Sequence, residues 1–486
     1  MSGAGKSFLG IAIVVSAILF SALLAGCFGV DGDVAKWEGE AWIPPHREEV
    51  EKKKQIEEYA HRDTDGPFFA GDLKLSDLLD IAFENSPITK KSWHAARIAA
   101  AQKGKAVSIF FPKVTISGVA DRAEIGSPGM KSNATSFYPA IEIQCSVFQF
   151  GGHAESVEAA RQLLYAANYQ YNRDLQTLAH TVQKCYFAMD SAEGVVDASE
   201  KNLVDSNVAY DAAYVRNMSG LADINDFLRA KANKARAEFE LENAKAKVEA
   251  ARANLARAIG VKVSEFIKIS RSKDPKSLHD FDIDVHKLIK KTMEARQDVM
   301  AFHSTIKAKK SAVAARRSKW LPELVIGYAG NSKHYRGSSG HFNNFDLSAA
   351  LRWTVFDGFN NVYDVIEAND ELRRKEEEFR ELRLGIAAEV WEKYHAFRSA
   401  VRQLHAARNY EHAAEESFNA TVISYNNGLS SFGDLMAAQN QTASARQQTV
   451  LSRNNLCMAI IDLAYAIGID GANGPVNDNN KGNSNE

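Results

Sequence analysis

The fold is decided by a long helical stretch that begins, at residues 151–190, with GGHAESVEAARQLLYAANYQYNRDLQTLAHTVQKCYFAMD. From there to Gly260 the chain has no proline, so nothing forces a break in a helix. Apolar residues such as Leu178 and Val182 recur every three or four positions, which is typical of a helix that buries one face. Residues 152–219 alone would form a helix on the order of 100 Å long. We therefore predict long helices that pack along one another as a coiled coil.

The same pattern is found again in the second half of the chain, at an offset of 208 positions. The matching pairs are Val147-Phe148 with Val355-Phe356, Gly220-Leu221 with Gly428-Leu429, Asp226 with Asp434, and Ile259-Gly260 with Ile467-Gly468. An offset that holds over this length indicates an internal duplication. We predict two repeats, residues 73–260 and 285–468, each with a helix, a β-hairpin, a long helix and a shorter return helix.

A β-hairpin precedes the long helix in each repeat, at residues 113–148 and 323–356. Apolar and polar side chains alternate there with the period of a half-buried strand. Four strands cannot close a barrel, and an open sheet with one apolar face has unpaired edges, so we predict a membrane β-barrel built from several chains. Aromatic residues at both ends of the strands match the two girdles of such a barrel. They are Phe110, Phe111, Phe148, Trp320, Trp353 and Phe356 at one end, and Phe137, Tyr138, Tyr335, Phe342 and Phe345 at the other.

The return helices are expected to stop half-way along the long ones. In the first repeat the predicted helices are 75–110, broken only at Pro87 near its start, then 152–219 and the return to Gly260. In the second repeat they are 285–319, 360–427 and the return to Gly468. The short helix before each hairpin would fill the remaining half. Residues 27–72 and 261–284 would form an equatorial belt at this level, and residues 469–486 a polar tail.

The first residues of the chain resemble a bacterial lipoprotein signal. Lys6 precedes an apolar run that ends at Leu24-Ala25-Gly26-Cys27. This predicts a signal peptide at residues 1–26 and a lipid, including palmitate, on Cys27. The alternative is an uncleaved anchor, although the apolar run is short for a membrane span.

Composition and motifs argue against several classes of function. The net charge is −2, so no basic surplus indicates nucleic-acid binding. Cys145, Cys185 and Cys457 lack the spacing of metal ligands. Glu392 and His395 have the spacing of a di-iron helix motif, but their counterparts in the first repeat do not match. We expect no enzyme, metal or cofactor.

From about Leu73 to Gly468 the chain resembles the TolC-like outer-membrane factors. The motifs that carry the resemblance are Phe111-Pro112, Leu321-Pro322, Trp353-x-x-Phe356-Asp357-Gly358, Ala295-Arg296-Gln297-Asp298-Val299 and Tyr425-x-x-Gly428-Leu429-Ser430-x-x-x-Asp434-Leu435. The resemblance implies a homotrimer with a 12-stranded barrel in the bacterial outer membrane and a helical tunnel in the periplasm. It also implies a periplasmic adaptor, or membrane fusion protein, joined to an inner-membrane transporter. The adaptor would dock at the hairpin tips, which are Gly220, Leu221, Gly428, Leu429 and Ser430.

The resemblance also implies a constriction at the tips. Better-known members close the tunnel with a tyrosine three residues before the tip glycine, an arginine two after it, and carboxylates six and nine after it. Tyr425 and Asp434 match this pattern, whereas Ser430 and Ala437 do not. We predict a constriction at Asp226, Tyr425 and Asp434 without that arginine. A further departure is Gln297, which stands where the family usually has proline.

These observations predict the outer-membrane exit duct of a tripartite export system for small molecules. Type I protein secretion is the alternative within the same class. A structural coiled-coil lipoprotein is the alternative from another class, but it does not account for four alternating strands with aromatic ends.

The substitution Cys27→Ser tests the predicted anchor. The cysteine thiol is the group that is acylated, so we expect the variant to lose its lipid and to stall in signal processing. Mass spectrometry of the mature protein and membrane fractionation check this. A variant with wild-type mass and fractionation would show that the lipoprotein interpretation is wrong.

Overall fold

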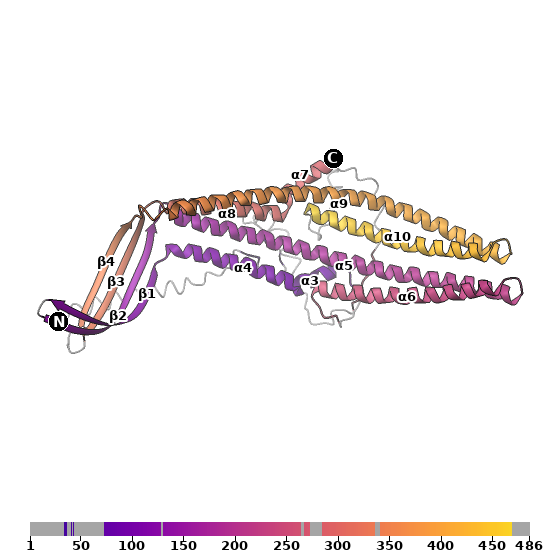
Figure 1. Cartoon of the computed structure of the whole chain (residues 1–486), viewed down its shortest axis with the longest axis horizontal. Helices are drawn as coiled ribbons and strands as arrows, with labels where there is room; N and C mark the ends of the chain where they lie inside the picture. The colour runs from indigo at the N-terminus through magenta and orange to yellow at the C-terminus, as the bar shows by residue number, and fades with distance from the viewer. Residues whose placement is uncertain are drawn as a thin grey trace, which may run out of the picture. The chain divides into compact units, whose positions relative to one another are not determined.

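The computed structural model describes residues 34–35, 40, 42, 72–127, 130–263, 267–272, 284–335 and 341–468. These residues form a mainly helical chain with one antiparallel sheet (Figure 1). They divide into two compact units, and each is described by itself. The first unit includes residues 93–169 and 300–379, and the second includes residues 170–299 and 380–468.

The first unit contains a four-stranded antiparallel sheet in chain order (Figure 1). Its strands are β1 (Lys113–Ser127), β2 (Met130–Phe148), β3 (Glu323–Tyr335) and β4 (His341–Arg352). The register pairs Ile141 with Gly330, and Gly330 with Phe345, so apolar residues of neighbouring strands share one face. Phe345 and Leu347 are exposed on this face. Both predicted hairpins are present, but β4 ends at Arg352 rather than at 356.

Two long helices and two return helices are found where the periodicity predicts them. They are α5 (Gly152–Met218) and α9 (Asn360–Asn426), of 67 residues each, and α6 (Ile224–Ile259) and α10 (Phe432–Ile467), of 36 residues each. The bounds of α9 and α10 lie 208 positions after those of α5 and α6. The turns contain Gly220 and Gly428 at φ of 68° and 74°, a left-handed conformation that glycine adopts without strain.

The helix predicted before the first hairpin is broken at Pro87 as expected, and the helix predicted before the second hairpin is also two helices. The first pair is α3 (Leu75–Asn85) and α4 (Pro87–Val107), and the second is α7 (Val285–Ala295) and α8 (Gln297–Ser318). Pro87 explains the first break, because proline disfavours a helical conformation in the residue before it. The prediction of one helix over 285–319 is wrong at Arg296, which is extended with ψ of 132° although no proline follows it.

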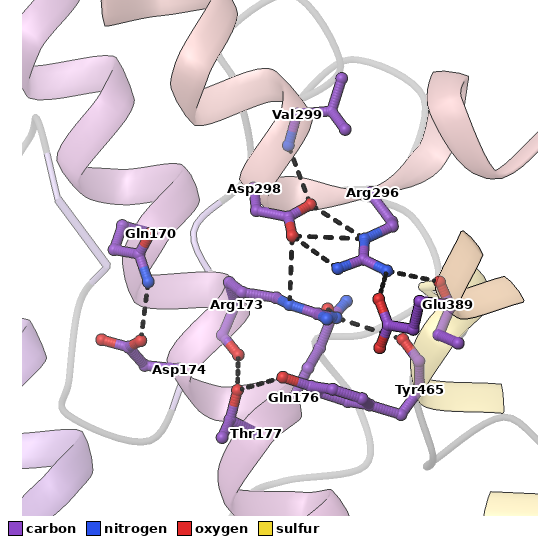
Figure 2. Close-up of polar contacts among 11 residues, drawn as sticks. Gln170, Arg173, Asp174, Gln176, Thr177, Arg296, Asp298, Val299, Glu389 and Tyr465 are labelled. Atoms are coloured by element: carbon purple, nitrogen blue, oxygen red, sulfur yellow. Dashed lines mark hydrogen bonds and ion pairs between the residues drawn. The ribbon is translucent and has the colours of Figure 1, made fainter. Parts of the chain in front are cut away.

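Arg296 follows the last residue of α7, and Figure 2 shows its side chain in contact with Asp298 and Glu389. Its guanidinium donates to Glu389 at 2.7 Å, to Asp298 at 2.7 Å and to the carbonyl of Ala466 at 2.8 Å. Arg296 is only 4% exposed. Burial opposes ionisation of Asp298, but its hydrogen bonds with Arg296 outweigh this and lower its pKa. The α7–α8 joint is therefore held to α9 and to the end of α10 by charge-assisted hydrogen bonds.

Each return helix ends against one of these joints. A Cβ at Gly260 would lie 2.8 Å from the carbonyl oxygen of Asn85, and one at Gly468 would lie 3.0 Å from the side chain of Arg296. Leu73 pairs with Ile269 in a parallel bridge close to the first joint. Within the predicted belt, Asp72 lies beside residues 267–272, since Lys268 Nζ is 2.8 Å from Asp72 Oδ1. Val34 and Ala35 belong to the first unit instead, and the tail 469–486 falls outside the described residues.

The Arg296 network generates a stability prediction. The substitution Arg296→Leu leaves two carboxylates without their buried partner, so we expect it to lower the free energy of unfolding by about 3 kcal/mol. Gln297→Pro is the control, because the first helical position tolerates proline and Arg296 is already extended. Thermal denaturation of the purified protein measures both variants. Equal melting temperatures for Arg296→Leu and the wild type would contradict this role.

Candidate functional site: the hairpin tips

The two hairpin tips in the second unit have similar backbone turns, each with a left-handed glycine, but the return helices that follow them have different N-caps. Asp223 caps α6 by accepting a hydrogen bond from Asn225 N. Ser431 caps α10 in a capping box with Asp434. At the two turns, Leu221 and Leu429 are 68% and 82% exposed. Each tip thus presents an exposed leucine on its turn. A side-chain cap fixes the start of the return helix that follows the turn.

A shared apolar core joins the tips. Large residues of the second hairpin pack against alanines of the first. The members are Phe418, Tyr425, Phe432, Leu435 and Ala438 from α9 and α10, and Ala209, Ala213 and Ala230 from α5 and α6. The small alanine side chains let the helices of the two hairpins approach closely, so both tips belong to one structure.

Tyr425 of the predicted constriction lies inside this core, with 3% of its surface exposed. Its ring is 5.8 Å from that of Phe432. Its hydroxyl is buried without a hydrogen-bond partner among the described residues. Burial raises the pKa of Tyr425; the charge of Arg216 opposes this rise and the charge of Asp226 adds to it. The charge of Asp226 thus acts on Tyr425, although the Tyr425 hydroxyl has no hydrogen-bond partner among the described residues.

Asp434 is exposed and takes part in the cap of its own helix. Its Oδ2 accepts hydrogen bonds from Ser431 Oγ at 2.7 Å and Ser431 N at 3.0 Å. These bonds lower the pKa of Asp434, so its charge is present at neutral pH. Asp226 is half-buried at the equivalent place in the first tip. That the two aspartates line a constriction stays a prediction.

The sequence analysis missed Arg216, which binds the backbone of the second tip from the first. Its Nη1 donates to the carbonyl of Tyr425 at 2.7 Å. The only signal in the sequence is a basic residue in the last turn of α5, where it suits the helix dipole. That signal does not indicate a contact with a helix more than two hundred residues away.

One set of side chains in the first unit has the residue types of a hydrolase. Ser146 Oγ donates to Glu323 at 2.6 Å and contacts His153 Nε2 at 2.8 Å. In a nucleophilic triad the carboxylate orients the histidine, which then takes the proton of the serine. Here the carboxylate binds the serine itself, so the arrangement does not activate a nucleophile. Among the residues that the structure describes, no group of His, Cys, Asp and Glu could hold a metal ion.

The predicted lipid-bearing residue, Cys27, lies outside the described residues. The three described cysteines form no disulfide with one another; Cys457 is buried, and Cys145 and Cys185 are half-buried. Burial raises the pKa of Cys185, which suits a structural role rather than a reactive thiolate.

Comparisons with known proteins agree with this architecture. The family model "Outer membrane efflux protein" matches residues 78–261 and 288–469. Protein CyaE of Bordetella pertussis is 28% identical over 355 residues, which cover 69% of this chain and 71% of that protein.

Solved structures with a similar fold include the outer-membrane channel OprN, at 18% identity and a TM-score of 0.73, covering 81% of this chain and 89% of that one. The outer membrane protein VceC of Vibrio cholerae is 15% identical with a TM-score of 0.72, covering 81% of this chain and 96% of that one. Since the family model spans most of the chain, the protein belongs to the outer membrane efflux protein family, and its function is that of an outer-membrane exit duct of an export system.

Proposed function

We propose that the protein is the exit duct of a tripartite system that passes small molecules from a periplasmic adaptor and an inner-membrane transporter to the outside. The observation that carries the proposal is a sheet with an exposed apolar face, joined directly to helices of 67 residues. Such a face suits lipid, and helices of this length suit a tunnel. A coiled-coil spacer would need no such sheet.

The edges of the sheet support an assembly of three chains. Among the described strands, β1 and β4 each have a neighbour on one side only, so their outer edges have no strand partner there. In a membrane those groups must be satisfied, which a closed barrel achieves. Three copies of the four-stranded sheet would give the 12-stranded barrel that the family resemblance implies.

The positions of Val34 and Ala35, which follow Cys27 in the predicted N-terminal segment, support a lipid on Cys27. In the first unit, Val34 packs with Ala99 and Leu164, and Trp93 Nε1 donates to the carbonyl of Ala35 at 3.0 Å. An extended chain spans at most about 25 Å over the seven residues from Cys27 to Val34. Phe110 lies just after the end of α4, and the rise along the helix from Ala99 to this point is on the order of 15 Å. A lipid on Cys27 is therefore within reach of the aromatic residues beside the sheet.

The exposed tips support docking of the adaptor. Leu221 and Leu429 stand on the turns with Gly220 and Gly428, and Ser430 follows half-buried. A pair of exposed apolar side chains on rigid turns suits contact with a protein partner. Identification of the adaptor and transporter that co-purify with crosslinked tips tests both this docking and the class of cargo.

Assembly and pore formation test the duct directly. The detergent-solubilised wild-type protein should have three times the mass of one chain by light scattering, and it should conduct ions in planar bilayers. A monomer that still forms pores would contradict the argument from the sheet edges. A trimer without pores would contradict the duct.

Two variants separate the charge of Asp434 from its role in the cap. Asp434→Asn keeps an oxygen that accepts from Ser431, but it removes the charge that would attract cations at the tunnel end. We expect it to weaken block by a trivalent cation added from the periplasmic side, and Asp226→Asn to do so by less. Ser431→Ala should keep the block and cost about 1 kcal/mol of stability. Unchanged block in the double Asp→Asn variant would leave these residues with the capping role alone.

A further inference from the structure

A hollow of about 530 Å³ lies in the first unit, where the strands of the sheet join the helices. Three charged residues line this junction hollow: Lys113 begins β1, Glu323 begins β3 and Arg352 ends β4. The 3₁₀ turn η2 (Ser108–Phe110), which follows α4, also contributes to it. The junction hollow therefore lies at the helix end of the sheet.

The register places these charges on the polar face of the sheet. Lys113 pairs with Gln144, and Glu323 pairs with Arg352. Successive side chains of a strand point to opposite faces, so Arg352 lies on the face opposite Leu351, which is exposed on the apolar face. If the apolar face contacts lipid, the junction hollow opens into the lumen of the proposed barrel.

Two of the three charges are available to a ligand. Glu323 accepts a hydrogen bond from Ser146 Oγ at 2.6 Å. Lys113 and Arg352 are exposed, and among the described residues neither side chain forms a hydrogen bond or an ion pair. An ammonium and a guanidinium are the groups that bind carboxylates, phosphates and similar anions.

The wall of the junction hollow next to Lys113 is apolar. Ile109, Phe111 and Pro112 line it, and the side chains of Ile109 and Phe111 are 40% and 59% exposed. Apolar surface left in water favours contact with the apolar part of a ligand. The site therefore suits a molecule that has both an acidic group and an apolar part.

Negative charges further along the same face limit the region that attracts an anion. Glu142 and Asp346 lie on either side of Ala329 in the register, further from the helix end. Their carboxylates repel an anion, and salt screens the field of the two cations over a short distance. An anion in the lumen would therefore be held at the junction hollow rather than along the whole sheet.

We propose that the junction hollow is a lumen site for organic anions, and that the cargo of the duct includes molecules with an acidic group and an apolar part. This rests on the proposed function, since only a duct has a lumen. In the barrel of three copies, β4 of one copy would pair with β1 of the next. That pairing brings Arg352 of one copy and Lys113 of the next to the same end of the barrel, so the cations of three hollows form one ring.

The test measures block of the full-length protein in planar bilayers by naphthalene-1,5-disulfonate added from the periplasmic side. The double variant Lys113→Gln/Arg352→Gln removes both charges, and Lys113→Arg/Arg352→Lys keeps them. Lys333→Gln is the matched control, because Lys333 lies on the same face of β3 near its other end, outside the junction hollow. Ethane-1,2-disulfonate is the control probe, since it has the same charge without the aromatic part.

We expect the double Gln variant to raise the half-blocking concentration of naphthalenedisulfonate about ten-fold, because it loses two charge-assisted contacts. The charge-keeping variant should retain most of the block, and Lys333→Gln should match the wild type. Ethanedisulfonate should block the wild type less than naphthalenedisulfonate does. Oligomer mass is recorded for every variant, and if the double Gln variant loses its oligomer, a raised half-blocking concentration in the two single Gln variants supports the proposal.

Equal half-blocking concentrations in the wild type and the Gln variants would overturn the anion site. A wild-type protein that forms no pore would instead overturn the proposed function. Isothermal titration of the detergent-solubilised protein with naphthalenedisulfonate would then decide whether the junction hollow binds the anion, since binding there must be lost in the double Gln variant. The two failures are therefore distinguishable.

Discussion

The unpaired carbonyls at helix C-termini are the constraint on which the second unit depends. Side chains of neighbouring helices satisfy them at two places. Arg296 binds the carbonyl of Ala466 at the end of α10, and Arg216 binds that of Tyr425 at the end of α9. Each of these bonds joins the end of one helix to a side chain from another part of the chain. The terminal carbonyls of α9 and α10 therefore also help to hold these helices against their neighbours.

The sequence predicts the long helices well because their signals are local. An absence of proline and a repeated apolar stripe place the ends of α5 and α9 within one residue, and glycines mark the turns. The break at Arg296 could not be predicted in this way. It depends on a side chain that reaches Glu389 and Ala466, which only the folded chain brings near. The end of β4 was misplaced for a related reason, since Trp353 continues the alternating pattern but donates to the carbonyl of Trp320.

The candidate site was predicted less completely than the fold. The tip glycines and Asp434 stand in the repeat, so they could be identified from the offset alone. Arg216 has no counterpart in the second repeat and therefore gave no repeated signal. The buried state of Tyr425 also depends on Phe432 and on alanines of the other hairpin, which a single stretch of sequence does not reveal.

The two halves of the chain share helix lengths and turn positions, but they differ in the side chains that end and cap their helices. A helix ends beside a joint at both places: Pro87 disfavours a helical conformation in Ser86, whereas Arg296 binds the distant oxygens of Glu389 and Ala466. In the same way α6 is capped by Asp223 and α10 by Ser431 with Asp434. The second cap keeps a carboxylate ionised and exposed at the tip, because hydrogen bonds from Ser431 favour the charged form. A residue that stabilises its own helix thus keeps a negative charge at the surface, so one side chain serves both the fold and the electrostatics of the tip.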